Sequence, residues 1–419
     1  MKIVKIEGSN PYERGLSHGR QLKEQIHEML NISQKRKAND NTETDYLKAV
    51  GDLMMKTPAV MDPINRYTPW LLDEIKGIAE AAEVDFVSLL AFQSLHLQLV
   101  IDDLGLLKSL DSHDTDSTKA SLGCTVVGGY QMDQNSTILA QNLDQTAVWD
   151  GYQVLFHIIE PENDLEIMTV AYPGFVGTLG LNNKGIGVCI NSIPMYLNKE
   201  LKGLPVIFLV RGLLSKSNID EAIDFMEAQR LSSGVVCTVG DSSKIVCYEC
   251  SPAKNVRFVP EKYPRYVYHT NHPLVNNDYG PLVKEKLEKL ESTSLYEITT
   301  TDVGLDKIQE NLTDPEWLEK ELPKYEFVGH LENSRVRLKT VQKYLDRHKD
   351  TLTVDDFKEI FSSKDDDLNT VCMDCNDNPL YKILEINTNF SIIMDLSENP
   401  VFYVADGPPS RAEYKKFTF

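Results

Sequence analysis

Hydrophobic and polar residues are spaced differently in the two parts of this chain, and the change falls near residue 123. Before it, apolar residues recur every three or four positions, which predicts amphipathic helices over 12–32, 70–82 and 84–100. After it, short apolar runs rich in β-branched residues predict strands. Between the two lies a polar stretch, 111–123, rich in Ser, Thr and Asp, which we predict to be an exposed linker.

The second part of the chain alternates groups of strands with groups of helices. Strands are predicted over 124–130, 136–143, 152–159, 165–172, 234–240, 244–250, 263–270, 389–396 and 401–406, and as a hairpin within 174–192. Helices are predicted over 204–216, 218–230, 281–292, 333–348 and 353–362. Two antiparallel sheets with helices on the outside fit this order.

Composition and charge narrow the classes of function. The 419 residues include 63 Asp and Glu against 43 Lys and Arg, a formal charge of −20. This excess of acids argues against a nucleic-acid partner, because phosphates are neutralised by clustered basic residues, and it disfavours an anionic membrane surface. No apolar run approaches the ~20 residues needed to span a bilayer, and the first residues lack a secretory signal. The seven sparse cysteines indicate a reducing, cytoplasmic setting.

Cys124 stands where the polar linker meets the first predicted strand. Cysteine is often buried as a small apolar residue, and this is the plainer interpretation of one cysteine taken alone. The alternative is that the Gly123–Cys124 peptide bond breaks. Cys124 would then carry a free α-amine, whose unperturbed pKa of about 7.7–8.0 lets it accept the proton of its own thiol at neutral pH. One residue would supply both nucleophile and base.

The residues around Cys124 suit such a cleavage without a protease. The thiol can attack the preceding carbonyl, the acyl group moves from nitrogen to sulfur, and water hydrolyses the thioester. Gly123 lacks a Cβ and tolerates a strained backbone at the scissile bond. A hairpin of the two predicted strands would fold Asp144 back beside Cys124, where its carboxylate can hold the amine. Without Cys124, capping of a strand-end turn would be the simpler role for Asp144.

Several short motifs, in order along nearly the whole chain, carry a resemblance. They are the glycine-rich start 8–19, Gly123-Cys124-Thr125, Gln141-Asn142-Leu143-Asp144, the glycine- and asparagine-rich run 174–191, Tyr268 to His272 with its Thr-Asn-His, Asn333-Ser334-Arg335, and Phe390 to Pro408. With them the chain resembles the acyl-CoA:6-aminopenicillanic acid acyltransferase-like family, the C45-type self-cleaving N-terminal-nucleophile (Ntn) hydrolases. It is more distantly similar to choloylglycine hydrolases and acid ceramidase-like amidases.

The resemblance implies a role for each matched residue. Cys124 would be the thiol nucleophile of an enzyme made as a zymogen, and Gly123–Cys124 would be its autocatalytic cleavage bond. Asp144 would support the α-amine of Cys124.

Two asparagines and one arginine would complete the site. Asn271 would donate a hydrogen bond to the oxyanion, and Asn191 would be a second donor. Losing one preorganised donor typically costs ~10²–10³ in rate. Arg335 would lie near the site and steady the nucleophile or a substrate carboxylate. Each side chain also has an ordinary structural alternative, which is capping of turns or strand ends for the asparagines and a surface pair within a helix for Arg335.

The other cysteines allow two further chemistries. Cys247 with Cys250 and Cys372 with Cys375 form two C-x-x-C pairs, a spacing found in structural zinc sites. The first pair falls within a predicted strand, however, where residues three apart point to opposite faces.

A papain-like protease could use Cys189 or Cys124 with His269 or His272. The chain order Cys, His, Asn of that class is not cleanly met, because Asn271 follows His269 by only two positions.

These observations predict an α+β protein with the four-layer αββα sandwich of Ntn hydrolases. Residues 1–123 would form a mainly helical pro-segment or small subunit ending in a processing loop, and 124–419 would form the catalytic domain. The two pieces should stay associated after cleavage, because the amphipathic helices of the first would bury their apolar faces against the second.

The expected chemistry is hydrolysis of a linear amide, such as an N-acyl amine or N-acyl amino acid, through an acyl thioester on Cys124. Acyl transfer from acyl-CoA or an amide donor to an amine uses the same intermediate and stays open as an alternative. A catalytically silent binding or scaffold protein is the alternative of another class. We expect a small-molecule amide or acyl-CoA as partner, and no cofactor or metal.

Overall fold

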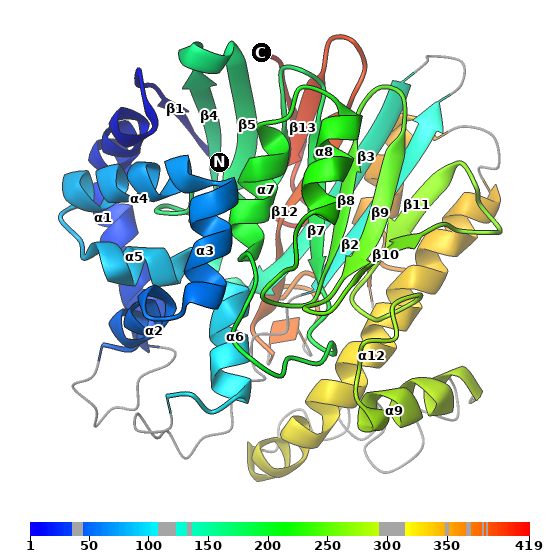
Figure 1. Ribbon diagram of the computed structural model, residues 1–419. Coiled ribbons are helices and arrows are strands. Elements are labelled where there is room, and N and C mark those ends of the chain that lie inside the picture. The colour runs from blue at the N-terminus through cyan, green and yellow to red at the C-terminus, as the bar shows by residue number, and fades with distance from the viewer. Residues whose placement is uncertain are drawn as a thin grey trace.

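Two β-sheets lie face to face in the protein, and helices cover both outer faces (Figure 1). A computed structural model describes residues 1–35, 45–107, 123–131, 136–292, 315–347, 352–365, 370–378, 381–382 and 384–419. The predicted linker 111–123 lies outside these residues, apart from Gly123, which opens a strand. The four-layer αββα architecture predicted from the sequence is confirmed.

The larger sheet has eight strands among the described residues, in the order β1-β4-β5-β6-β7-β8-β9-β10. They are β1 Lys2–Ile6, β4 Val154–Glu160, β5 Leu165–Ala171, β6 Leu179–Asn182, β7 Gly187–Ser192, β8 Val235–Gly240, β9 Ile245–Cys250 and β10 Asn255–Phe258. Neighbours are antiparallel except β1 and β4, which run parallel. β6 and β7 form the hairpin predicted within 174–192. Its turn needs a glycine, because Gly185 has a φ of +87°.

The smaller sheet has six strands in the described part of the chain, all antiparallel, in the order β11-β2-β3-β12-β13-β14. They are β11 Tyr266–His269, β2 Gly123–Gln131, β3 Ser136–Thr146, β12 Ile386–Asp395, β13 Val401–Ala405 and β14 Tyr414–Phe417. β2 and β3 form the hairpin expected at the start of the second part. The sequence did not predict β10 or β14, because both are short edge strands with mostly half-exposed side chains and little apolar pattern.

Helices form the outer layers. α7 Val206–Leu214 and α8 Ile219–Glu227 pack on the larger sheet, whereas α12 Pro315–Arg347 and α13 Val354–Ser362 pack on the smaller one (Figure 1). With α9 Pro281–Ser292, these match the predicted helices, except that α12 begins well before the expected residue 333. Over the described ranges, no helix combines the length and apolar character needed to cross a membrane.

The N-terminal segment is mostly helical but also contributes a strand. Its helices are α1 Pro11–Lys35, α2 Tyr46–Met55, α3 Pro58–Tyr67, α4 Pro69–Ala82, α5 Phe86–Phe92 and α6 Leu95–Asp103. The single helix expected over 84–100 is two helices. Between them, Gln93 donates to the carbonyl of Gly174 at 2.7 Å and accepts from the N–H of Val176 at 3.0 Å, so tertiary contacts fix the break.

Buried ion pairs tie the N-terminal segment to the strands and helices that follow. Arg14 of α1 contacts Glu162 at 2.6 Å and Glu160 at 3.8 Å. Arg211 of α7 contacts Glu160 at 3.2 Å and Glu74 of α4 at 3.0 Å. Because both arginines and two of the three carboxylates are almost fully buried, removing one partner would leave an uncompensated buried charge.

Candidate active site

Cys124 and Asp144 lie at the same end of the β2–β3 hairpin. The strand register pairs Gly123 with Asp144 and Cys124 with Leu143. Both residues are buried, and the register places their side chains on opposite faces of the smaller sheet, Cys124 on the face toward the larger sheet. The predicted juxtaposition of these two residues is therefore present in the structure.

The backbone of Cys124 is held by three side chains from distant parts of the chain. Its N–H donates to Oδ1 of Asn271 at 2.8 Å. Its carbonyl accepts from Nη1 of Arg337 at 2.6 Å and from Nδ2 of Asn191 at 3.2 Å. Asn191 is the penultimate residue of β7 on the opposite sheet, so the cysteine lies where the two sheets meet.

Asn271 lies two residues after the end of β11 and turns its amide oxygen, not its amide nitrogen, toward Cys124. Oδ1 also accepts from Nη2 of Arg337 at 2.8 Å. Nδ2, the atom that would serve an oxyanion, donates to the carbonyl of Ser192 at 3.0 Å. The backbone N–H of Asn271 donates to Oγ of Ser334 on α12 at 2.7 Å. In this arrangement Asn271 holds the nitrogen of Cys124.

Asp144 is a buried carboxylate with one oxygen engaged and one oxygen open. Oδ1 accepts from Oγ1 of Thr388 at 2.6 Å. Oδ2 is buried and has no hydrogen-bond partner in the described residues. Burial raises the pKa of Asp144 to about 6, although the charge of Arg337 and the hydrogen bond from Thr388 act in the opposite direction. This carboxyl group therefore titrates near neutral pH.

The thiol of Cys124 is not acidic in the unbroken chain. Burial, with the neighbouring carboxylate of Asp144, raises its pKa to about 12 despite the charge of Arg337. The thiolate is the reactive form of cysteine. Attack by this sulfur at neutral pH thus requires a base that takes its proton during the reaction.

Gly123 is the residue that the space beside Asp144 requires. A Cβ placed there would lie 2.9 Å from Cβ and 3.0 Å from Oδ2 of Asp144, and 3.1 Å from Cε of Met373. These contacts are closer than ordinary van der Waals packing allows, so the open oxygen of Asp144 lies directly against the residue whose carbonyl would be cleaved.

Arg337 is the site residue that sequence reasoning missed. The predicted residue, Arg335, is half-buried on the same helix, and its charge contributes to lowering the pKa of His272. Arg337 is fully buried and contacts Cys124 and Asn271 directly. Helical spacing was the available signal, because Arg337 lies one turn after Asn333 and its Nε donates to Oδ1 of Asn333 at 2.8 Å.

The residues of the competing chemistries have other partners. Nε2 of His269 lies 2.7 Å from Oε1 of Glu249, and Nδ1 of His272 lies 2.7 Å from Oγ of Ser334. Cys247 and Cys250 are buried within β9. All seven cysteines are free thiols, and the described ranges contain no group of three or more His, Cys, Asp or Glu placed to hold a metal.

Two facing sheets between helix layers are typical of the Ntn class of amidohydrolases and acyltransferases, and Cys124 is the second residue of β2 in the smaller sheet. The chain belongs to the acyl-coenzyme A:6-aminopenicillanic acid acyl-transferase family, whose model matches residues 131–382. This range contains Asp144, Asn191, Asn271 and Arg337, while Cys124 lies just before it.

Curated relatives match part of the chain. A β-alanyl-dopamine/carcinine hydrolase of Drosophila melanogaster is 26% identical over 218 residues, which cover 48% of this chain and 52% of the fly protein. Protein dcd1A of Dictyostelium discoideum is 24% identical over 271 residues, which cover 57% of this chain and 54% of that protein. The chain thus spans about half the length of the curated relatives it matches.

The solved structures that the chain matches include two bacterial enzymes. A conjugated bile acid hydrolase from Clostridium perfringens is 13% identical, with a TM-score of 0.39 over 71% of this chain and 97% of that one. Penicillin V acylase from Agrobacterium tumefaciens is 14% identical, with a TM-score of 0.38 over 68% of this chain and 82% of that one.

Proposed function

We propose that the chain cleaves itself at Gly123–Cys124 and then hydrolyses small linear amides through an acyl thioester on Cys124. One observation carries this proposal. The nitrogen that cleavage would release as an α-amine is already held by Asn271, while the open oxygen of Asp144 lies against Gly123. Neither feature is needed by a cysteine that only fills space.

Self-cleavage begins with removal of the thiol proton of Cys124, and the ionised Asp144 is the base. The sulfur bonds to the carbonyl carbon of Gly123 and forms a tetrahedral adduct. The carbon–nitrogen bond then breaks and the nitrogen of Cys124 takes a proton, which leaves a thioester. Water hydrolyses the thioester to a free thiol and a carboxylate on Gly123.

Turnover repeats the chemistry with the α-amine as base. The amine takes the thiol proton, the sulfur attacks the substrate amide carbonyl, and the leaving amine departs with that proton. Asn271 Oδ1 continues to hold the nitrogen of Cys124. Asn191 and Arg337 fix the residue by its carbonyl. Asn271 Nδ2 and Asn191 Nδ2 are the donors to the oxyanion. Asn271 exchanges its bond to Ser192 for the substrate oxygen, and Asn191 exchanges its bonds to the carbonyls of His269 and Thr270 while keeping the one to Cys124.

The fragments 1–123 and 124–419 stay associated after cleavage. β1 lies in the larger sheet beside β4, with five residue pairs in register. The buried ion pairs Arg14–Glu160 and Arg211–Glu74 run between the two fragments. Separation would expose a strand edge and leave buried charges without partners. The cytoplasmic setting remains a prediction from the cysteine content.

The fly relative supports one substrate class for first testing. Its name describes hydrolysis of β-alanyl-dopamine and carcinine, so N-aminoacyl amines lead the panel, followed by N-acyl amino acids. The family name describes acyl transfer, which makes transfer from acyl-CoA to an amine the second candidate. Faster donor consumption and a new amide on adding amine would favour transfer.

Mass spectrometry of the purified chain and of Cys124→Ala tests the proposal. The wild type should yield two fragments, the larger beginning at Cys124, and should turn over at least one amide. Cys124→Ala should stay whole and inactive, whereas Cys375→Ala, which alters a half-exposed thiol, should behave as wild type. Normal cleavage or turnover by Cys124→Ala would overturn the assignment of the nucleophile.

A further inference from the structure

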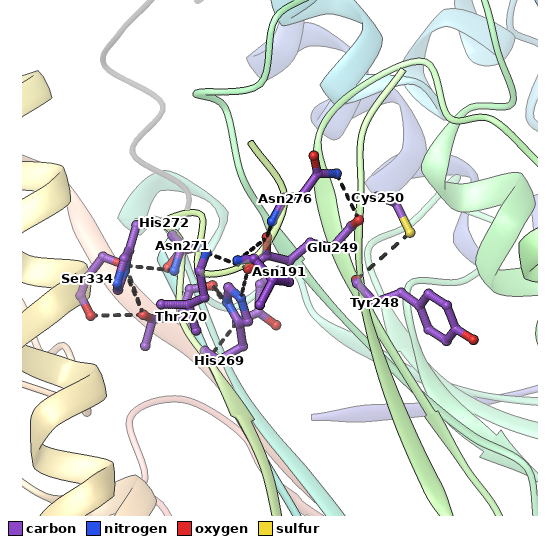
Figure 2. A network of polar contacts seen from close by, with 12 residues as sticks. Asn191, Tyr248, Glu249, Cys250, His269, Thr270, Asn271, His272, Asn276 and Ser334 are labelled. Atoms are coloured by element: carbon purple, nitrogen blue, oxygen red, sulfur yellow. Dashed lines mark hydrogen bonds and ion pairs between the residues drawn. The ribbon is translucent and has the colours of Figure 1, made fainter. Parts of the chain in front are cut away.

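Glu249 of β9 is a fully buried carboxylate surrounded by donors (Figure 2). Both of its oxygens accept more than one hydrogen bond. Oε1 accepts from Nε2 of His269 at 2.7 Å and from the N–H of Leu274 at 2.6 Å; Oε2 accepts from the hydroxyl of Tyr196 at 2.6 Å and from the N–H groups of Val275 at 3.1 Å and Asn276 at 2.7 Å. This carboxylate thus binds three consecutive backbone N–H groups of the segment 274–276.

The donors keep this carboxylate ionised. Burial alone would raise the pKa of Glu249, but the hydrogen bonds and charge of His269, with those of Tyr196 and Asn276, outweigh burial and lower the pKa to about 2. The charge is therefore present throughout the neutral range.

The segment 270–276 is fixed from two sides, and Asn271 lies between the two anchors. On one side, Ser334 of α12 accepts from the N–H of Asn271 at 2.7 Å, and its carbonyl accepts from Oγ1 of Thr270 at 2.9 Å. On the other side, Glu249 holds His269 before Asn271 and the backbone after it. Figure 2 shows both anchors converging on the short segment that carries Asn271.

We propose that Glu249 is a positioning residue, which sets the place of Asn271 beside Cys124 through its hydrogen bonds to His269 and the 274–276 backbone. This inference rests on the proposed function, in which Asn271 holds the nitrogen of Cys124. Two oxygens are required, because donors approach both. A glutamine at this position would turn its amide nitrogen toward at least one backbone N–H and push the segment away from β9.

Self-cleavage supplies a readout that needs no substrate. Full-length chains are made by cell-free synthesis, and the uncleaved fraction is followed with time for wild type, Glu249→Gln, Asn271→Ala and the double variant. Because loss of a preorganised group typically costs ~10²–10³ in rate, displacing Asn271 without removing it should slow cleavage about tenfold.

The double variant distinguishes a positioning role of Glu249 from a general loss of stability. In the Asn271→Ala background, Glu249→Gln should slow cleavage less than about twofold, because the side chain through which it acts is already gone. Equal fold-losses in the two backgrounds, or normal cleavage by Glu249→Gln, would overturn the role of Glu249.

Three further variants complete the design. Glu227→Gln, which removes an exposed carboxylate bound to the hydroxyl of Tyr248, controls for the loss of charge and should cleave normally. Ile360→Ala, which truncates a buried side chain of α13, controls for lowered stability and should also cleave normally. If Glu249→Gln does not fold, Tyr196→Phe removes a single donor and should slow cleavage about twofold, again only when Asn271 is present. Failure of the wild type to cleave would instead refute the proposed function itself.

Discussion

Asp144 and Glu249 are both fully buried carboxylates, one on each sheet, and their surroundings are opposite. Glu249 accepts five hydrogen bonds, and its pKa falls to about 2. Asp144 accepts one side-chain hydrogen bond, from Thr388, and its pKa rises to about 6. Burial penalises both charges, so the number of donors decides whether the charged form is favoured.

The difference separates a carboxylate that holds structure from one available for chemistry. A saturated buried carboxylate stabilises the segment that supplies its donors. An unsaturated one is costly to the fold, and such groups are concentrated at functional sites. The open oxygen of Asp144 faces Gly123, the proposed cleavage position, whereas Glu249 lies behind Asn271 and faces no reacting atom.

The largest effect is expected from Asp144→Asn. Cleavage should slow by about 10²–10⁴-fold, because the base is lost. In a Cys124→Ala background, which keeps all chains whole, the same change should increase the free energy of unfolding at pH 7. The pKa of Asp144 is higher in the folded chain than in the unfolded chain, so folding disfavours its ionised form. This lowers the free energy of unfolding by up to about 3 kcal/mol above pH 6 and by much less near pH 4.

Cleavage is measured by mass spectrometry and stability by urea unfolding at the two pH values. A variant that cleaves normally and unfolds more easily at pH 7 would make Asp144 an ordinary structural carboxylate, and the contrast with Glu249 would disappear.

Glu249→Gln should have the opposite effect on stability. A folded-state pKa below the unfolded value contributes stability above about pH 4.5, which is lost as the pH falls toward 2. We expect a loss of about 3 kcal/mol at pH 7, in the Cys124→Ala background, and a smaller difference from the parent at pH 3.5. Urea unfolding at both values measures this. If the loss of stability in Glu249→Gln is the same at both pH values, Glu249 stabilises the fold through its packing and not through its charge.

Gly123→Ala tests the close approach of Asp144 to the scissile residue. The added Cβ would lie only 2.9 Å from Cβ and 3.0 Å from Oδ2 of Asp144, so the carboxylate or the scissile residue must shift. Such a shift should slow cleavage about 10- to 100-fold. Gly280→Ala is the matched control, because a Cβ there meets no atom within 4 Å. Equal cleavage rates in the two variants would show that the space beside Gly123 does not matter.

Local patterns predicted one half of the site and long-range packing supplied the rest. The pairing of Cys124 with Asp144 follows from two neighbouring strands of similar length, so the hairpin could be read from the sequence. The donors to Asp144 and to the carbonyl of Cys124, Thr388 and Arg337, come from elements more than 200 residues further along. Their approach depends on how β12 and α12 pack, which no local period reveals.

The same distinction explains the errors in the fold. The four-layer architecture could be predicted because the long helices and strands have clear periodic patterns of apolar residues. β1 is a five-residue strand that forms only by pairing with β4, about 150 residues later. α3 contains Pro58 and Pro63, which weaken its helical pattern in the sequence. The sequence places Glu249 within a C-x-x-C strand and gives no sign of its role, because its donors come from β11 and from segments outside the strands that approach it only after folding.

The smallest expected effect is that of changing Thr388. It is also the most direct test of the contrast between the two carboxylates. Wild-type cleavage should rise with pH and level off above about pH 6, because Asp144 acts as a base only when ionised. Thr388→Val removes the hydroxyl that stabilises the charged form, so the pKa of Asp144 should rise and the midpoint of the profile should move up by about one pH unit.

Thr388 also accepts from the N–H of Met373, so some stability is lost as well. That loss would lower the rate at every pH without moving the midpoint. A profile that keeps its midpoint in Thr388→Val would therefore identify some group other than Asp144 as the base.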